Sequence, residues 1–347
     1  MSDGTIHYIY DKWIKLPADP TTSFSGKTIL ITGANSGIGL QACIKFAKLG
    51  ASKIIAGVRN LEKGNAAKET IENVSKRTGV VPVVEVWQLD LDSYDSIKSF
   101  AARASKDLQR LDVAILNAGV RKFSYVVSKY GWEETIQVNT LSNVLLALLL
   151  LPKLQENPDP SSPSSLQFIT SGLHRGLKVK PAHREAANII ESYSSKKAFG
   201  ENAFLDEGAD QYAASKLFIM CAMKRIAASV QHENQSSSLI VTASCPGYVK
   251  SGIGREFSSN PFRYVLKSMV EFVCMRSTEA GSRIFVSGAT LGEKGQGKFW
   301  RHDAVQPDAA EISGEKGREL IDKVWHDILT SLSKDMPEVV DLAKNIK

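Results

Sequence analysis

From residue 28 onward, short apolar segments rich in β-branched residues alternate with longer segments whose apolar residues recur at helical spacing. A short apolar segment without polar alternation is typical of a strand covered on both faces, as in a parallel sheet between two layers of helices. Right-handed crossovers between such strands give a doubly wound α/β fold. The predicted strands are 28–32, 53–57, 83–89, 112–119, 166–171 and 239–247.

The helices predicted between these strands place the sheet in a single Rossmann-type domain, residues 27–305. The predicted helical segments are 39–50, 61–77, 96–108, 131–156 and one that carries Tyr212. Residues 1–26, with Pro17 and Pro20, form an N-terminal arm. Residues 306–347 form a tail whose helix has one apolar face. That face carries Leu320, Val324, Ile328 and Leu332.

The cysteines and the charge balance exclude several classes of protein. The four cysteines are scattered, with no Cys-x-x-Cys pair and no His/Cys cluster, so we expect reduced, buried thiols and no metal site. They are Cys43, Cys221, Cys245 and Cys274. The net charge of +6, from 43 Lys and Arg against 37 Asp and Glu, is spread without a basic stripe. It therefore suits an anionic ligand but does not indicate nucleic-acid binding.

The chain also shows no signal for export or for membrane insertion. The N-terminus carries Asp3 and Asp11 and lacks an apolar core, so it is not a secretory signal. The longest apolar run, 144–151, is shorter than the roughly 20 residues that span a bilayer. We therefore expect a cytoplasmic protein with no integral membrane segment.

The sequence ITGANSGIG, residues 31–39, places three glycines between the first strand and the first helix. Glycine permits a tight turn and lets the backbone approach a pyrophosphate, and the helix N-terminus favours that anion. We predict a dinucleotide site in this turn. Its residues are Gly33, Asn35, Ser36, Gly37, Ile38 and Gly39.

Four further motifs follow later strands, and with the glycine-rich turn they resemble the short-chain dehydrogenase/reductase family. They are Asn117-Ala118-Gly119, Ser171, the Tyr-x-x-x-Lys pair Tyr212 and Lys216, and Pro246-Gly247. The resemblance covers roughly residues 27–300. Within the family, the sequence is similar to the retinol-dehydrogenase-like branch and to fungal reductases of secondary metabolism. The resemblance implies a nicotinamide cofactor and a Rossmann-type fold.

The second strand indicates which nicotinamide cofactor is used. An NAD site usually offers a carboxylate about 20 residues past the glycines. Here Arg59 stands 20 residues after Gly39 and no acid is present in 53–60. A guanidinium can hold a 2′-phosphate bidentately, so we predict NADP(H), with Lys63 as a weaker contact.

The resemblance implies further cofactor contacts. Asp90, followed by Leu91, would meet the adenine, although Asp90 could equally cap the following helix. Asn117 would support the adenine-side ribose and the central sheet. The segment around Val249 would hold the carboxamide, and Ser251 replaces the threonine usual in the family.

The Tyr212–Lys216 pair predicts acid–base chemistry at a carbonyl or alcohol. A free phenol has a pKa of about 10, too high for an effective base near neutral pH. The charge of Lys216, one helical turn further on, together with that of the oxidised nicotinamide ring, should lower this pKa, and a shift of about three units would be worth roughly 4 kcal/mol. Ser171 would hold the substrate oxygen. By the family pattern, Asn139 would hold Lys216 through a water.

Residues 172–209 and 248–275 should shape the substrate site. The 41 positions from Ser171 to Tyr212 exceed the family's spacing, so 172–209 is expected to be an inserted loop acting as a lid or wall. By resemblance, 248–275 is the substrate cap, and its apolar and aromatic content suits a bulky apolar molecule. His174, three residues past Ser171, is expected in a surface loop that borders the substrate site. The segment around Ser171 is not a Gly-x-Ser-x-Gly elbow and no acid is placed to orient His174, so a hydrolase relay is excluded.

The sequence therefore predicts an NADP(H)-dependent oxidoreductase that interconverts a ketone and a secondary alcohol on a bulky apolar small molecule, such as a polyketide, terpenoid or alkaloid. Two alternatives stay open. One is a membrane-associated dehydrogenase of lipid or retinoid type. The other is a non-catalytic NADP-sensing protein. Family members often form dimers through helices near 131–156 and 210–230, so a homodimer is compatible with the sequence.

Overall fold

The computed structural model describes residues 16–76, 79, 81–157, 161–200, 208–231, 238–250 and 275–344. Its strands are β1 Thr28–Thr32, β2 Lys53–Val58, β3 Val83–Gln88, β4 Val113–Leu116, β5 Ser164–Ile169, β6 Leu239–Ser244, β7 Phe299–Arg301 and β8 Ala304–Gln306. Its longer helices are α2 Gly37–Lys48, α3 Leu61–Lys76, α4 Tyr94–Asp107, α6 Asn143–Gln155, α10 Ala209–Ser229, α12 Thr278–Gly288 and α13 Gly314–Ser333. Short helices are α5 Glu134–Ile136, α7 Pro181–Arg184, α8 Ile189–Ser194, α9 Lys196–Gly200 and α14 Val339–Leu342.

Within these residues the strands form one sheet in the order β3-β2-β1-β4-β5-β6-β7-β8. All neighbouring strands from β3 to β7 are parallel. The strands are added outward from β1, first toward β3 and then, from β4 onward, on the other side of β1, as in a doubly wound sheet. The predicted fold class and the six predicted strands are confirmed. The short strands β7 and β8 were not predicted, and β8 runs antiparallel to β7.

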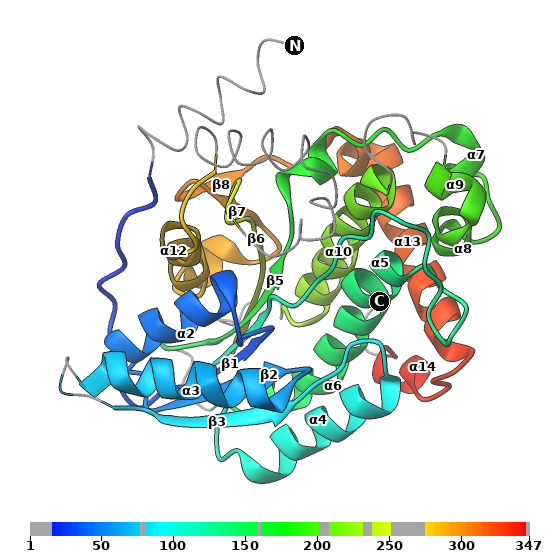
Figure 1. Ribbon diagram of the computed structural model, residues 1–347. Helices are drawn as coiled ribbons and strands as arrows, with labels where there is room; N and C mark the ends of the chain where they lie inside the picture. The colour runs from blue at the N-terminus through cyan, green and yellow to red at the C-terminus, as the bar shows by residue number, and fades with distance from the viewer. Residues whose placement is uncertain are drawn as a thin grey trace, which may run out of the picture.

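Helices cover both faces of the sheet (Figure 1). On one face α2, α3 and α12 enclose a cluster that includes Ile29, Phe46 and Phe285, all fully buried. On the other face α4, α6 and α10 enclose a larger cluster that includes Leu30 and Phe218. The carboxyl ends of the parallel strands therefore meet at one edge, where the ligand site is expected.

The tail is confirmed as a helix with one buried face, because α13 packs along α10 (Figure 1). Leu320, Val324, Ile328 and Leu332 are each at most 1% exposed. Burying one such side chain stabilises the fold by about 1.5–3 kcal/mol. Because α13 covers α10 and α14 lies against α6, the chain's own tail covers part of the surface through which a homodimer was expected.

The inserted segment is more ordered than a lid loop. Residues 172–200 form a 3-10 turn at Gly172–Arg175 followed by α7, α8 and α9. Ile189 and Ile190 are fully buried, and Asp327 on α13 accepts a hydrogen bond from the Ile189 amide at 2.8 Å. The expectation of a loop for 172–209 was therefore wrong for the described part, which contributes to the core beside α10 and α13.

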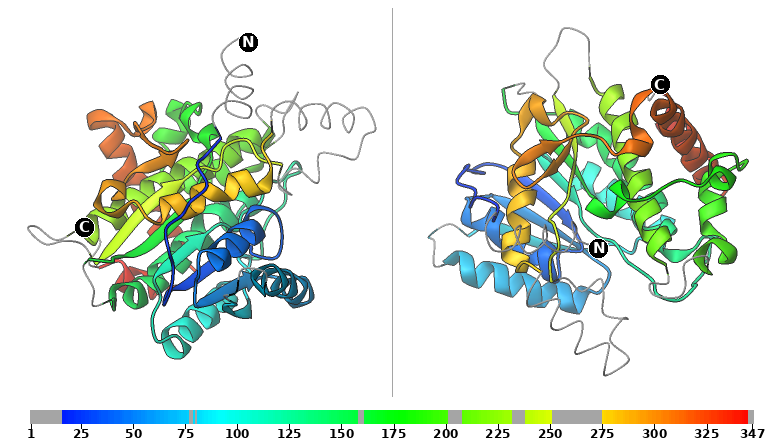
Figure 2. Two further views of the ribbon diagram at one scale, coloured as in Figure 1. Left: turned by 90° about the vertical axis from the view of Figure 1, so that its left-hand side faces the viewer. Right: turned by 90° about the horizontal axis from the view of Figure 1, so that it is seen from above.

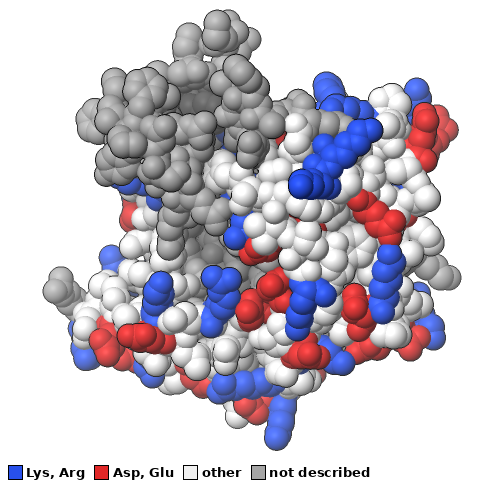
Figure 3. Space-filling model, turned by 45° about the vertical axis from the view of Figure 1, so that its right-hand side comes forward, with Lys and Arg blue, Asp and Glu red and all other residues white. Residues whose placement is uncertain are grey.

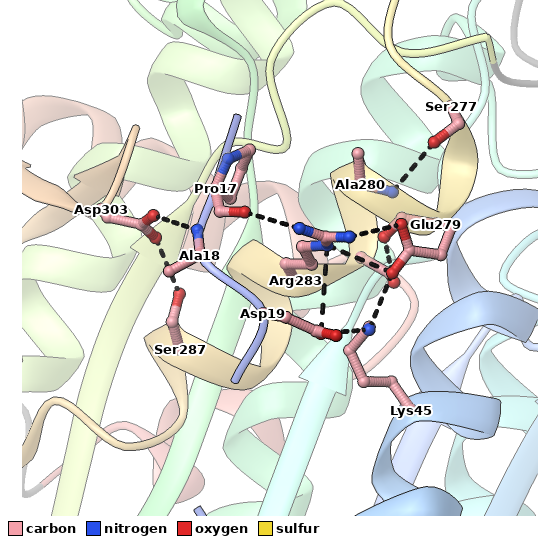
Figure 4. A network of polar contacts seen from close by, with 11 residues as sticks. Pro17, Ala18, Asp19, Lys45, Ser277, Glu279, Ala280, Arg283, Ser287 and Asp303 are labelled. Atoms are coloured by element: carbon pink, nitrogen blue, oxygen red, sulfur yellow. Dashed lines mark hydrogen bonds and ion pairs between the residues drawn. The ribbon is translucent and has the colours of Figure 1, made fainter. Parts of the chain in front are cut away.

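The described end of the arm, residues 16–26, is pinned across α2 and α12 (Figures 2 and 4). Lys45 of α2 pairs with Asp19 at 2.7 Å and with Glu279 of α12 at 2.8 Å. Arg283 of α12 donates to the carbonyl of Pro17 at 3.0 Å. The amide of Ala18 donates to Asp303 at 2.8 Å, so the arm also reaches the β7–β8 turn.

One stretch of helix in the described residues, Glu134–Gln155, is long and apolar enough to cross a membrane, because α5 continues through a π-helical segment into α6. This span is longer than the apolar run seen in the sequence. Inside the molecule 89% of its most apolar window is buried. The apolar residues of this helix are therefore explained by its packing in the core between α4, α10 and the sheet.

The face of the molecule drawn in Figure 3 and the three described thiols agree with the expectations from the sequence. On the face drawn in Figure 3, basic and acidic side chains are interspersed. Cys43, Cys221 and Cys245 are buried free thiols. Cys274 lies outside the described residues.

Candidate active site

The glycine-rich turn joins β1 to α2 at the carboxyl edge of the sheet. Gly33 and Gly37 have φ of +67° and +58°, a region that favours glycine. A methyl group on Gly39 would lie 2.4 Å from the carbonyl oxygen of Gly33. The first turn of α2 carries no acidic residue, and the Ser36 side chain makes no capping hydrogen bond. The start of α2 thus presents its first amides without an acidic or capping side chain of the turn, which fits a pyrophosphate.

The turn after β4 is fastened to the glycine-rich turn. Asn117 donates its amide to the carbonyl of Thr32 at 2.8 Å, and the Ala118 amide donates to the Thr32 hydroxyl at 2.9 Å. These contacts fit the predicted supporting role of Asn117. These two hydrogen bonds join the turns at the carboxyl ends of β1 and β4.

A cleft of about 430 Å³ opens along these two turns. Eleven of the predicted cofactor residues line it: Gly33, Asn35, Ser36, Gly37, Ile38, Gly39, Arg59, Lys63, Asn117, Ala118 and Gly119. Five lining residues were not predicted: Asn60, Val120, Arg121, Lys122 and Glu134. Of these, Val120, Arg121 and Lys122 directly follow the Asn117–Gly119 turn, so extending the strand-end rule by three residues would have found them. Glu134 comes from α5, and no sequence signal pointed to it.

Arg59 and Lys63 lie at the end of β2 and in the first turn of α3. Both side chains border the cleft, and Asn60 between them accepts a hydrogen bond from the Lys63 amide at 2.8 Å. Asn60 therefore caps α3. A ligand phosphate at this end would meet two positive charges and no carboxylate among the lining residues at that end.

Asp90 and Leu91 lie at the end of β3 but do not line the cleft. Asp90 accepts a hydrogen bond from the Asp92 amide at 3.0 Å. The cap of α4 is Ser93, which accepts from the Ser96 amide at 3.4 Å, so the alternative role of Asp90 as a helix cap is wrong. The adenine contact of Asp90 stays a prediction.

Tyr212 lies in the first turn of α10 and is 8% exposed. Burial raises its pKa to about 12, and a hydrogen bond with the Ser171 side chain opposes that shift. Without cofactor, the desolvation of a phenolate in this site outweighs the nearby charges of the chain, and the lowered pKa expected with the oxidised nicotinamide ring in place stays a prediction. The phenol is therefore protonated at neutral pH.

Ser171 follows β5 and faces Tyr212. The neighbouring Thr170 donates its hydroxyl to the carbonyl of Lys216 at 3.1 Å and is 3% exposed. Thr170 therefore has a structural role in holding α10 to β5. This leaves Ser171 as the hydroxyl at the phenol, as the family pattern implies.

Lys216 is held under the Asn117–Gly119 turn. Its ammonium donates to the carbonyl of Ile169 at 3.0 Å and lies 5.7 Å from the centroid of the Tyr212 ring. Burial lowers its pKa to about 8. A methyl group on Gly119 would lie 2.8 Å from Oδ1 of Asn139 and 3.5 Å from Nζ of Lys216, so both side chains border that glycine.

Asn139 lies in a π-helical segment, Gln137–Ser142. Such segments are rare and are frequent at functional sites. The Asn139 side chain accepts from the Val120 amide and donates to the Val120 carbonyl, each at 2.8 Å. It also donates to the Ser215 hydroxyl at 3.1 Å. Asn139 therefore fixes the segment after β4 relative to α10.

The Pro246–Val249 segment follows β6, and its backbone is fixed at two points. Gly247 has φ of +83°, and Val249 pairs with Arg276 at the start of α12. Cys245, just before it, accepts hydrogen bonds from the amides of Gly172 at 3.3 Å and Gly247 at 3.4 Å. Ser251 and residues 251–274 of the expected substrate cap lie outside the described residues.

His174 is not a surface residue, which corrects the expectation from the sequence. It is fully buried, its ring meets Phe299 edge-on at 5.0 Å, and Nδ1 lies 2.5 Å from the carbonyl oxygen of Ser171. Burial lowers its pKa to about 4, so the ring is neutral at physiological pH. A neutral ring can donate Nδ1–H to that carbonyl and hold the turn that carries Ser171.

The comparisons with known proteins agree with this geometry. Residues 27–161 match the family model described as short chain dehydrogenase. The short-chain dehydrogenase/reductase ffsI of Aspergillus flavipes is 40% identical over 94% of this chain and 92% of its own length. The short-chain dehydrogenase/reductase phmF of Phaeosphaeria nodorum is 39% identical over 92% of this chain and 90% of its own length. The chain belongs to the short-chain dehydrogenase/reductase family, and the resemblance to fungal reductases is confirmed.

Solved structures share the fold at lower identity. The oxidoreductase yciK from E. coli superposes with a TM-score of 0.56 at 22% identity, covering 84% of this chain and 100% of that one. The Pseudomonas aeruginosa RhlG/NADP active-site complex gives a TM-score of 0.57 at 19% identity, covering 81% of this chain and 96% of that one.

Proposed function

We propose that this protein is an NADPH-dependent reductase that converts a ketone on a bulky, largely apolar small molecule to a secondary alcohol. The observation that carries the proposal is that Ser171, Tyr212 and Lys216 lie together next to residues that line the cleft. Lys216 borders Gly119, and the Tyr212 ring lies beside Arg121. When bound, the nicotinamide would supply the hydride to the carbonyl carbon. The protein's own residues would position the ketone and supply the proton.

The protonation state of Tyr212 supports the reductive direction. Because burial keeps the phenol protonated at neutral pH, it can donate a proton to the carbonyl oxygen as negative charge develops there. The Ser171 hydroxyl can hold the same oxygen. The Lys216 ammonium lies close enough to the ring to stabilise the phenolate that remains.

The lining of the cleft supports NADP(H) rather than NAD(H). Arg59 and Lys63 would hold the 2′-phosphate. Replacing Arg59 by Leu should weaken NADPH binding about 10- to 100-fold, because a charge-assisted hydrogen bond contributes about 1.5–3 kcal/mol. NADH affinity, measured on the same variant by fluorescence titration, should stay unchanged. Equal loss for both cofactors would contradict the assignment.

An apolar substrate is supported by large hydrophobic side chains that stay exposed beside the site. Leu173, two residues after Ser171, is 46% exposed, and Tyr248, next to Gly247, is 39% exposed. Exposed apolar side chains next to Ser171 and Gly247 in the chain suit a ligand whose burial provides most of the binding energy.

The deciding experiment is NADPH oxidation with a panel of bulky ketones. Tyr212→Phe should lower turnover by about 10²- to 10⁴-fold, the usual contribution of a general acid, while NADPH still binds. The matched control is Tyr125→Phe, because the Tyr125 hydroxyl donates to the carbonyl of Ser194 at 3.1 Å and Tyr125 does not line the cleft. Undiminished turnover in Tyr212→Phe would remove the proposed mechanism.

A further inference from the structure

A second cation lies beside the Tyr212 ring. The guanidinium carbon of Arg121 is 5.6 Å from the ring centroid, as close as the Lys216 ammonium at 5.7 Å. Arg121 follows the Asn117–Gly119 turn after β4, so the two cations reach the ring from different elements. The Tyr-x-x-x-Lys motif accounts only for Lys216.

The position of Arg121 is fixed by its neighbours. Its guanidinium carbon also lies 4.9 Å from the Phe123 ring centroid, and the residue lines the cleft. The backbone just before it is held by Asn139, which bonds both the amide and the carbonyl of Val120. Guanidinium groups stack on aromatic faces and keep their charge there.

We propose that Arg121 stabilises the phenolate of Tyr212 and thereby supports proton transfer, acting through Tyr212 rather than by contact with the substrate. The inference rests on the proposed function, in which Tyr212 exchanges the proton. Arg121 is in this sense a positioning residue.

The charges around the phenol support this role. The groups around it are Lys216 from α10, Ser171 from the segment after β5, Cys245 from the segment after β6 and Arg121 from the segment after β4. The Lys122–Glu134 ion pair, at 3.2 Å, follows Arg121 in the chain, and His174 contacts the Ser171 carbonyl. Burial is the main cause of the raised Tyr212 pKa, Cys245 adds to it, and the Arg121 charge lowers it. His174 is neutral above about pH 4 and adds no charge.

The two cations differ in how they respond to pH. Burial lowers the pKa of Lys216 to about 8, so its charge is lost as the pH rises above that value. A guanidinium stays charged throughout the range in which enzymes are assayed. Above pH 8, therefore, Arg121 becomes the main positive charge that the protein offers to the phenolate.

The test is the pH dependence of kcat/KM for alcohol oxidation, the direction that needs the phenolate. In Arg121→Met the part of the pH profile in which Tyr212 loses its proton should move to higher pH by about one unit. This is the lower end of the pKa shift caused by an opposite charge at about this distance. Arg121→Lys should restore most of the shift. Arg103→Met is the matched control. Arg103, on α4, also has its guanidinium over an aromatic ring, 4.2 Å from the Trp87 centroid, but it does not line the cleft.

A second readout does not depend on turnover. A ring-fluorinated tyrosine at position 212, followed by fluorine NMR, reports the ionisation of this phenol directly in the wild type and in Arg121→Met. A higher midpoint in Arg121→Met supports the proposal. An unmoved midpoint, or a rise in KM with an unmoved pH profile, overturns it. If no ketone or alcohol is turned over while the midpoint shifts, the proposed function fails and the coupling of Arg121 to Tyr212 stands.

Discussion

Replacing Gly39 by alanine tests whether the glycine-rich turn is a close-fitting cofactor cradle. The added methyl carbon would lie 2.4 Å from the carbonyl oxygen of Gly33 and 2.8 Å from the Asn117 amide nitrogen, whereas ordinary contact begins at 3.4 Å. The turn would have to open by about 1.0 Å on the side of the backbone carbonyl. Because that carbonyl is main chain, it cannot rotate away as a side chain would.

Overpacking of this kind costs about 1–3 kcal/mol. If the turn keeps its open form when the cofactor binds, the amides at the start of α2 no longer converge on the pyrophosphate. We therefore expect NADPH affinity to fall about 10- to 100-fold, since 1.4 kcal/mol corresponds to a factor of ten. Fluorescence titration gives the affinity, and urea unfolding of the same sample separates it from a loss of stability.

Two other glycines make this experiment specific. An added methyl group at Gly200 meets nothing within 4 Å, so Gly200→Ala should leave both affinity and stability unchanged. Gly37→Ala also meets no atom but must adopt φ of +58°, which isolates backbone strain from the steric clash. If Gly39→Ala binds NADPH as tightly as the wild type and is equally stable, the turn is not the cradle inferred from its geometry.

Two predictions concern stability. Asp112→Ala should lower the free energy of unfolding, measured by urea unfolding, by about 2–3 kcal/mol, because the buried carboxylate accepts a hydrogen bond from the Thr28 amide at 2.8 Å and pairs with Lys27 at 3.2 Å. Asp107→Ala is the control and should change the stability little, because Asp107 belongs to an exposed ion pair. His174, whose pKa falls from 6.5 to about 4 on folding, should contribute stability that is complete above pH 6.5 and lost, up to about 3 kcal/mol, as the pH falls through 4. His174→Asn should remove that part of the pH dependence, and identical pH curves for both proteins would refute it.

The parts of the fold that the sequence predicted are those governed by strong local patterns. Strands such as 28–32 are continuous apolar runs, and the carboxyl ends of parallel strands must meet at one edge, which brought the glycine-rich turn, Ser171 and Tyr212 together. The strands β7 and β8 have three residues each, too few to show a period. The helices α7, α8 and α9 are similarly short, so their pattern does not predict them. The burial of Ile189 depends on its contact with α13, far along the chain, which the local sequence does not show.

The energies of the site depended on burial, which a motif does not show. The spacing of Tyr212 and Lys216 placed the two groups correctly, yet desolvation moves each toward its neutral form, raising the pKa of the phenol to about 12 and lowering that of the ammonium to about 8. Desolvation acts on both members of a buried pair, so a single lysine cannot be assumed to activate a buried phenol. Below about pH 8 Lys216 supplies part of the positive charge that favours proton release, and above that pH the charge must come from outside the helix. Within the chain, Arg121 is placed to supply part of it.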